Sequence, residues 1–294
     1  MFRIKSANIL TLLLTLAVVF TTALPAFASG KDTISVRNAK LPDQLYYREP
    51  FELSGSIRSQ NSLSRVILHV CTEDGDTVFL KTFRIGQKTF SLRTVNSYLD
   101  FAELPCGAYT LTVEVKNKSV GQRTVIQQDF TINDPYVTTS FADTESLVLA
   151  FSLKEDGDRY ISENFRIKEF ACNDGSDLIL IDRKLVALLQ AVRSDFNAPT
   201  TITSGFRSPS YNSEVPNAKS NSYHTKGMAA DICVSGVSPL SVARYAESLG
   251  ANGIGWYDTD KDGHFTHVDT RPSSKRFYWR TQQTIGVSTF YAFG

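Results

Sequence analysis

The sequence predicts a two-part chain, in which an all-β sandwich precedes an α+β domain with a small antiparallel sheet and helices. In the first half of the 294 residues, short segments alternate apolar and polar residues between turn-forming residues. In the second half, helical and strand patterns alternate along the chain. These patterns divide the chain into a sandwich at 31–134, a linker at 135–158 and the α+β domain at 159–294.

Residues 1–28 have the pattern of a secretory signal peptide. Arg3 and Lys5 give a positive start, an apolar run covers 9–20, and Ala26-Phe27-Ala28 supplies small residues for cleavage. The run is shorter than the roughly 20 apolar residues that span a bilayer, so an uncleaved anchor is the weaker alternative. We therefore expect a secreted protein that has no membrane contact after cleavage.

The charge balance of the mature chain argues against a nucleic-acid partner. Cleavage removes Arg3 and Lys5, so the 31 basic residues fall to 29 against 30 acidic ones, a net charge of about −1. Phosphate contacts need clustered Lys and Arg side chains, and the sequence contains no such block.

The first part has the strand pattern of a β-sandwich. Segments 51–57, 66–70 and 109–115 alternate in polarity, and turn signals such as 73–76 separate them. Strands at this spacing predict an antiparallel sandwich of immunoglobulin-like size. Because His and carboxylate residues do not cluster here, we expect this part to position the second domain or to bind a surface.

The second part combines helices with strands. Asp182 can cap a helix whose apolar residues repeat at helical spacing, and another helix is expected from Ser238-Pro239 to Gly250. Strands are expected at 199–203, 230–234, 254–257 and 265–269. The apolar segment 147–153 is either a strand or a short helix at the junction.

Four cysteines in an exported chain allow three complete disulfide pairings. Pairing within each part, Cys71 with Cys106 and Cys172 with Cys233, is the simplest expectation.

Three residues of the second part are candidate metal ligands: His224, Asp231 and His267. Two imidazoles and one carboxylate provide three ligands for zinc and leave a fourth position for water, the arrangement of a hydrolytic rather than a structural site. Three of the four histidines of the chain fall within 203–269, which favours a shared site over scattered surface residues.

Three motifs resemble those of the zinc D-Ala-D-Ala carboxypeptidase family, the M15-type peptidases of bacterial cell walls. They lie at 203–208, 222–231 and 265–271, and the resemblance covers about 160–279. It implies that His224, Asp231 and His267 bind one zinc ion. It also implies that Arg207 grips a substrate carboxylate, for which its planar charged fork is suited. Ser222 belongs to a polar segment at 208–223, which is expected to form the rim of the substrate cleft and to contact substrate.

The general base is where this sequence departs from the family pattern. Related enzymes often carry an acidic residue three positions before the last histidine ligand, and His264 occupies that position here. Histidine has an unperturbed pKa of about 6.5 and can act as a base. Asp262 is the second candidate, and a zinc-activated water that needs little help is the third.

A calcium loop competes for part of the same stretch. Asp258, Asp260 and Asp262 precede Gly263 in the D-x-D-x-D-G form, with Asp269 at the twelfth position. An EF-hand needs flanking helices, whereas the preceding segment has a strand pattern, so an acidic hairpin turn is the favoured interpretation.

The resemblance implies a secreted zinc peptidase of the bacterial cell wall that hydrolyses peptidoglycan stem peptides. A D,D-carboxypeptidase is the first expectation and a D,D-endopeptidase the second. A zinc-containing wall-binding module without catalysis is the alternative from another functional class.

Overall fold

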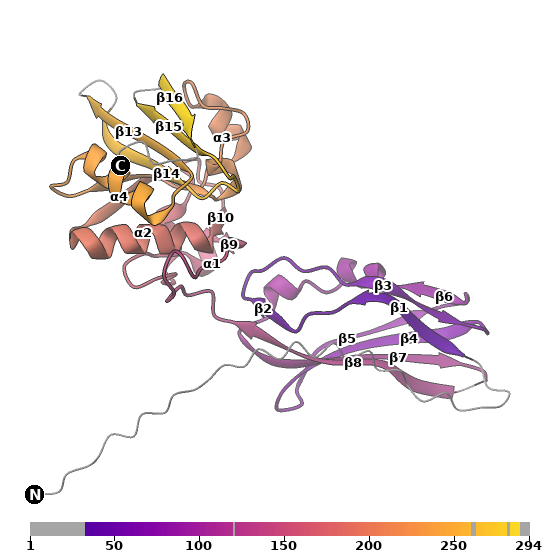
Figure 1. Cartoon of the computed structure of the whole chain (residues 1–294). Helices are drawn as coiled ribbons and strands as arrows, with labels where there is room; N and C mark the ends of the chain where they lie inside the picture. The colour runs from indigo at the N-terminus through magenta and orange to yellow at the C-terminus, as the bar shows by residue number, and fades with distance from the viewer. Residues whose placement is uncertain (1–32, 120, 260–262, 281–282, 289–294) are drawn as a thin grey trace, which may run out of the picture.

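The computed structural model describes residues 33–119, 121–259, 263–280 and 283–288. Its N-terminal part is rich in β-strands, and its C-terminal part combines helices with strands, as Figure 1 shows. The predicted signal peptide lies outside the described residues. Within the described ranges, no helix has the length and apolar character needed to cross a bilayer.

Two sheets make up the N-terminal part. One has the strand order β1 (Ile34–Lys40), β3 (Ser54–Ser59) and β6 (Thr89–Ser91). The other has the order β2 (Gln44–Tyr46), β8 (Gly121–Asn133), β7 (Gly107–Asn117), β4 (Leu63–Thr72) and β5 (Thr77–Arg84). The prediction of a wholly antiparallel arrangement is wrong at β2, which pairs with β8 in parallel. The chain enters β2 from β1 in the other sheet and not through a hairpin from β8, so no tight turn imposes the antiparallel direction.

The two N-terminal sheets contribute to one hydrophobic cluster. Alternate residues of β4, such as Val66 and Leu68, are fully buried, and so is Leu111 of β7. Ile57 of β3 and Phe90 of β6 belong to the same cluster. The period of two predicted from the sequence is therefore present. An immunoglobulin-like arrangement of these strands stays a prediction.

The C-terminal part is built on a six-stranded sheet. Its order is β11 (Thr200–Ser204), β12 (Ala229–Val234), β14 (Gly263–Asp269), β13 (Gly253–Thr259), β15 (Arg276–Arg280) and β16 (Gln283–Ser288). The strands predicted at 199–203, 230–234, 254–257 and 265–269 are confirmed, and no observed strand end differs from the predicted one by more than two residues. The sheet is not wholly antiparallel as predicted, because β15 runs parallel to β13. After β14 the chain crosses to the other side of β13, where β15 pairs with it. Because β15 runs in the opposite direction to β14, it runs in the same direction as β13.

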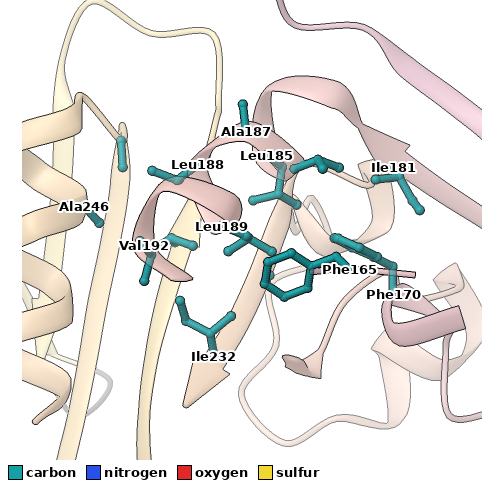
Figure 2. Packing of buried hydrophobic residues seen from close by; sticks show 14 of the residues in the cluster. Phe165, Phe170, Ile181, Leu185, Ala187, Leu188, Leu189, Val192, Ile232 and Ala246 are labelled. Carbon is teal, nitrogen blue, oxygen red and sulfur yellow. The ribbon is translucent and has the colours of Figure 1, made fainter. Parts of the chain in front are cut away.

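Two amphipathic helices cover this sheet, and both are confirmed. Helix α2 (Arg183–Phe196) begins after Asp182, whose side chain accepts a hydrogen bond from Lys184 N. Its buried leucines pack with Phe165, Phe170 and Ile232 (Figure 2). Helix α4 (Pro239–Leu249) begins after Ser238 and ends at Gly250. Two short helices, α1 (Leu153–Asp156) and α3 (Pro209–Glu214), lie outside these patterns.

The segment predicted as a linker, 135–158, is packed against the C-terminal part. Its strand β9 (Val148–Ser152) pairs with β10 (Leu178–Asp182), and the chain then turns into α1. Leu149 and Phe151 of β9 are buried in the cluster that contains α2. The ambiguous apolar segment is thus a strand followed by a short helix.

The predicted disulfides are wrong. All four cysteines lie among the described residues, and each is a free thiol. Cys172 is buried and its sulfur accepts a hydrogen bond from Ser208 N, whereas Cys71 lies beside His69 on the same strand. Equal numbers of cysteines in each part do not bring their side chains into disulfide geometry.

Candidate metal centre

His224, Asp231 and His267 converge on one point of the C-terminal sheet. One ligand atom of each lies within 4.8 Å of the others. Asp231 in β12 is the register partner of His267 in β14, and Asp231 Oδ1 lies 2.9 Å from His267 Nδ1. His224 Nε2 lies 3.1 Å from the same His267 nitrogen. Strand pairing therefore supplies two donors, and the turn before β12 supplies the third.

That turn depends on Gly227. His224 begins the short 3₁₀ helix His224–Lys226, and Gly227 ends it with φ of 70°, a left-handed conformation that disfavours side chains. A Cβ at this position would also overlap the carbonyl oxygen of Leu180. Glycine is required here for close packing against β10, which lets the chain turn from His224 into β12.

Each imidazole is oriented by an oxygen on its other nitrogen. His224 Nδ1 donates to the Gly205 carbonyl at 2.7 Å, which leaves Nε2 for a metal. His267 Nε2 donates to Asp269 Oδ2 at 3.2 Å, which leaves Nδ1. Partners of this kind fix the tautomer and the ring orientation of histidine ligands.

Asp269 is a buried and fixed carboxylate. It is fully buried, and Arg271 Nε donates to its Oδ1 at 2.7 Å. Burial raises the pKa of Asp269, but hydrogen bonds from Arg271 and His267 outweigh burial and lower this pKa to about 2. Gly253, its register partner in β13, leaves the space for this carboxylate, because a Cβ there would overlap it.

Asp231 supplies a negative charge to the group. Burial raises its pKa, but the charges and hydrogen bonds of His224 and His267 outweigh burial and hold the pKa well below the usual range. Arg207 Nη2 also donates to Asp231 Oδ2 at 2.6 Å. The carboxylate is therefore ionised, as metal binding requires.

The donor set fits zinc. Two imidazole nitrogens and one carboxylate oxygen are ligand types that zinc accepts, and three protein ligands are typical of its catalytic sites. The three residues are between 2% and 9% exposed, so such an ion would lie at the floor of a cavity.

A cavity of about 720 Å³ opens above this group. Residues 215–219 and 221–223 form one wall, and side chains of the sheet form the other. The sheet wall includes four aromatic residues: Tyr257, Phe265, Phe277 and Trp279. A cavity of this size can hold several residues of an extended peptide.

Arg207 and Ser222, the predicted substrate-binding residues, both line the cavity. The guanidinium of Arg207 is turned toward the metal group: Nη2 donates to Asp231, and Nε donates to Ser204 Oγ at 2.8 Å. Ser222 Oγ accepts a hydrogen bond from His224 N at 3.3 Å and so shapes the turn. Their contacts with substrate stay predictions.

The structure does not bring His264, the first candidate base, to the metal group. His264 is exposed, and the period of two in β14 places it on the opposite face from His267. On β14 the cavity is lined by Phe265, His267 and Asp269, and not by His264. Asp262, the second candidate, lies outside the described residues.

Calcium binding receives no support. Asp260 and Asp262 lie outside the described residues, while both carboxylate oxygens of Asp258 accept hydrogen bonds from Arg280 Nη2. Asp269, the twelfth residue of the suggested loop, is bound by His267 and Arg271 instead. Strands β13 and β14 stand where an EF-hand has helices.

Comparison with known proteins identifies the segment that carries this geometry. Residues 162–269 match the family model for Peptidase M15. This segment belongs to the Peptidase M15 family. The family predicted from the three motifs is therefore confirmed, and the M15 segment contains all three metal-binding candidates.

Two curated relatives of the chain are peptidoglycan L,D-endopeptidases by name. Over 80 residues the chain is 40% identical to the probable peptidoglycan L,D-endopeptidase MepK of Haemophilus influenzae. It is 36% identical over 80 residues to the peptidoglycan L,D-endopeptidase MepK of Escherichia coli K12. The matches cover 26% of this chain and 41% and 42% of the two relatives, so the chain aligns with less than half of their length.

The residues that surround His224, Asp231 and His267 are not predicted from the sequence. Asp269 and Arg271 belong to the third motif, and Asp269 also to the suggested calcium loop, but neither is predicted to orient a metal ligand; Gly253, Gly255 and Trp279 have no predicted role. The two glycines were a usable signal, because they lie two apart in β13 and so face the same side of the sheet.

Replacing Asp269 with asparagine is expected to weaken zinc binding by about 10- to 100-fold, because the carboxylate orients the His267 ring and raises its basicity. The measurement is competitive titration of the protein with zinc and a chelating dye. Asp258→Asn, at an exposed ion pair of the same sheet, is the matched control and should bind zinc as the unchanged protein does. Equal zinc affinity of Asp269→Asn and the control would contradict this role.

Proposed function

We propose that this chain is a zinc-dependent peptidase that cleaves bonds within peptidoglycan stem peptides, as an endopeptidase. The observation that carries the proposal is the buried His224, Asp231 and His267 group at the floor of a cavity of about 720 Å³. Membership of the M15 family and the endopeptidase names of the curated relatives support the same activity.

The residues of the chain have distinct roles in this proposal. His224, Asp231 and His267 hold the zinc ion, which supplies Lewis-acid chemistry toward a carbonyl group and toward water. Gly205 and Asp269 orient the two imidazoles. The two walls of the cavity hold the peptide in an extended form across the metal group and exclude part of the solvent.

A D-Ala-D-Ala carboxypeptidase is the second candidate, because Arg207 lines the cavity beside the metal group. A carboxypeptidase needs a cation free to pair with the terminal carboxylate of its substrate. Two nitrogens of Arg207 already donate to Asp231 and Ser204, which favours a role of Arg207 in holding Asp231 and therefore favours the endopeptidase. A module that binds wall peptides without cleaving them is the third outcome of the test.

Peptides with free and with amidated C-termini separate these candidates. With zinc, we expect the purified protein to cleave an internal bond of cross-linked stem peptides equally well in both forms, because an endopeptidase does not use the terminal carboxylate. A chelator should abolish cleavage, and added zinc should restore it. The products are identified by mass spectrometry.

Other results of the same assay assign the other candidates. Release of single D-Ala from the free form alone, with a KM at least tenfold higher in Arg207→Met, would establish the carboxypeptidase instead. Peptide binding without chelator-sensitive cleavage would establish the binding module. Binding can be followed by titration calorimetry on the same preparation.

We also propose that the protein acts outside the cytoplasm, in the bacterial cell wall. The support is the signal-peptide pattern of residues 1–28 and the extracellular position of peptidoglycan.

A further inference from the structure

Aromatic side chains form the wall of the cavity that lies against the metal group. We propose that Trp279, Tyr257 and Phe265, here called the aromatic wall, bind an uncharged alkyl side chain of the substrate residue next to the cleaved bond. This inference rests on the proposed peptidase function and adds the residue preference of the same site.

The position of Trp279 follows from strand register. His267 in β14, Gly255 in β13 and Trp279 in β15 are register partners across three neighbouring strands. Neighbouring strands lie about 4.8 Å apart, so the Cα atoms of His267 and Trp279 are separated by about 10 Å. Gly255 has no side chain to fill the space between His267 and Trp279. The indole of Trp279 therefore lies over Gly255, and its ring centroid is 4.9 Å from that of His267. A Cβ at position 255 would overlap the indole.

This contact fixes which part of a substrate meets Trp279. His267 is a metal-binding candidate, so a bond held over the metal group lies one side chain away from the indole. The substrate residue that flanks this bond is therefore the one within reach of Trp279. Tyr257 and Phe265 continue the wall farther along the same two strands, β13 and β14.

The aromatic wall presents ring carbons rather than polar groups to the cavity. Trp279 Nε1 donates to the Tyr257 hydroxyl at 2.9 Å, so the indole donor is used within the wall. The rings of Tyr257 and Phe265 are stacked, with centroids 4.2 Å apart and planes 15° apart. All three side chains are half-buried and line the cavity. Such a surface gains most from contact with apolar groups.

The charges near the aromatic wall disfavour a charged side chain. Arg271 lies with its guanidinium 5.9 Å from the centre of the Trp279 ring, so it repels a cation at this place. An anion gains little from Arg271, because that fork is already bound to Asp269. Arg207 is likewise bound to Asp231. Because both arginines that line the cavity are already paired, a charged group would lose water here and gain little from them, whereas an alkyl group loses little.

The test compares stem peptides that differ only in the residues flanking the cleaved bond: glycine, alanine or norleucine. Each buried methylene is worth about fourfold in binding, so the unchanged protein should prefer norleucine over glycine by at least about tenfold in kcat/KM. Trp279→Ala removes the ring, and Gly255→Ala displaces it without removing it. Both variants should lose this preference, with a KM for the norleucine peptide that rises to that for the glycine peptide.

Tyr98→Ala is the matched control, because Tyr98 is a 52% exposed aromatic residue of the N-terminal part. It should keep the full preference. The inference is overturned if both Trp279→Ala and Gly255→Ala reduce kcat/KM for all peptides by the same factor, since that pattern indicates a structural role. Zinc content of each variant is measured in parallel, so loss of metal is detected directly.

A binding measurement tests the aromatic wall without catalysis. The chain has two tryptophans, and Trp256 is buried at 7% exposure. In Trp256→Phe, fluorescence reports Trp279 alone. Addition of acetyl-Gly-X-Gly-amide peptides to the metal-free protein should shift the emission to shorter wavelength when X is norleucine, with at least tenfold weaker binding when X is glycine.

The two measurements separate the inference from the proposed function. No chelator-sensitive cleavage of any peptide by the unchanged protein would reject the peptidase, and the fluorescence titration would still decide the aromatic wall. Cleavage without any difference between glycine and norleucine in either measurement would reject the aromatic wall and retain the peptidase.

Discussion

Replacing His224 with alanine is expected to eliminate zinc retention and to lower peptide hydrolysis by at least about 1,000-fold. A metal ion supplies several kcal/mol of transition-state stabilisation, and each 1.36 kcal/mol is a factor of ten in rate. His224 is only 2% exposed, and its Nδ1 is held by Gly205, so no neighbouring group can take over the vacated ligand position without moving the turn. Metal analysis after dialysis and the rate of peptide cleavage are the two measurements.

The other histidines of the chain supply matched controls for this experiment. His69→Ala, in β4 of the N-terminal part, should retain zinc and full activity. His264→Ala decides between the sequence prediction and the geometry: loss of about 100-fold or more in kcat with zinc retained would support a general base. Activity within about threefold of the unchanged protein would instead agree with its place on the opposite face of β14. Zinc retention and near-normal activity of His224→Ala would contradict the metal site itself.

The sequence alone predicts those structural features that depend on residues close together in the chain. Helix α2 could be predicted because Asp182 caps it and leucines repeat at helical spacing. The ends of α4 follow in the same way from Ser238-Pro239 and Gly250. The metal-binding candidates could be predicted because their residue types and motif spacing carry the chemistry without any knowledge of the sheet.

The features that were missed or wrong depend on which strands become neighbours. Trp279 reaches His267 only because β15 lies beside β13 with Gly255 between them, and a parallel pairing leaves no hairpin signal in the sequence. The general-base role of His264 stays a prediction that His264→Ala tests, and a separation of three residues in a strand places its side chain on the opposite face from His267. The predicted disulfides are wrong for a related reason, since counting cysteines in the sequence gives no distance between their sulfur atoms.

The junction between the two parts was also beyond sequence reasoning, because its ion pairs join residues far apart in the chain. Arg48 is 5% exposed, and its Nε donates to Asp156 Oδ2 at 3.0 Å. Its Nη1 and Nη2 donate to Glu103 and Glu155 at 2.6 and 2.5 Å. Asp156 is itself 4% exposed and also accepts a hydrogen bond from the Tyr47 hydroxyl. One arginine of the N-terminal part thus neutralises a buried carboxylate of α1.

Replacing Arg48 with methionine is expected to lower the free energy of unfolding by about 3–5 kcal/mol, because Asp156 would be left as a buried charge without its cation. The measurement is urea unfolding. Glu103→Gln is the control at the same arginine: the Glu103 side chain is 64% exposed, so this change should cost at most about 1 kcal/mol. A cost for Arg48→Met as small as that of the control would show that the junction contributes little to stability.

The double variant Arg48→Met/Asp156→Asn separates loss of the ion pair from loss of packing. Removing both charges eliminates the unpaired carboxylate, so the double variant should be more stable than Arg48→Met alone.

Both tryptophans lie in the C-terminal part, so fluorescence follows that part while circular dichroism follows the whole chain. If Arg48 couples the two parts, the two signals should change together in the unchanged protein and at different urea concentrations in Arg48→Met. Coincident transitions in Arg48→Met would mean that the apolar contacts of Tyr46 and Tyr47 with the C-terminal core suffice for the coupling.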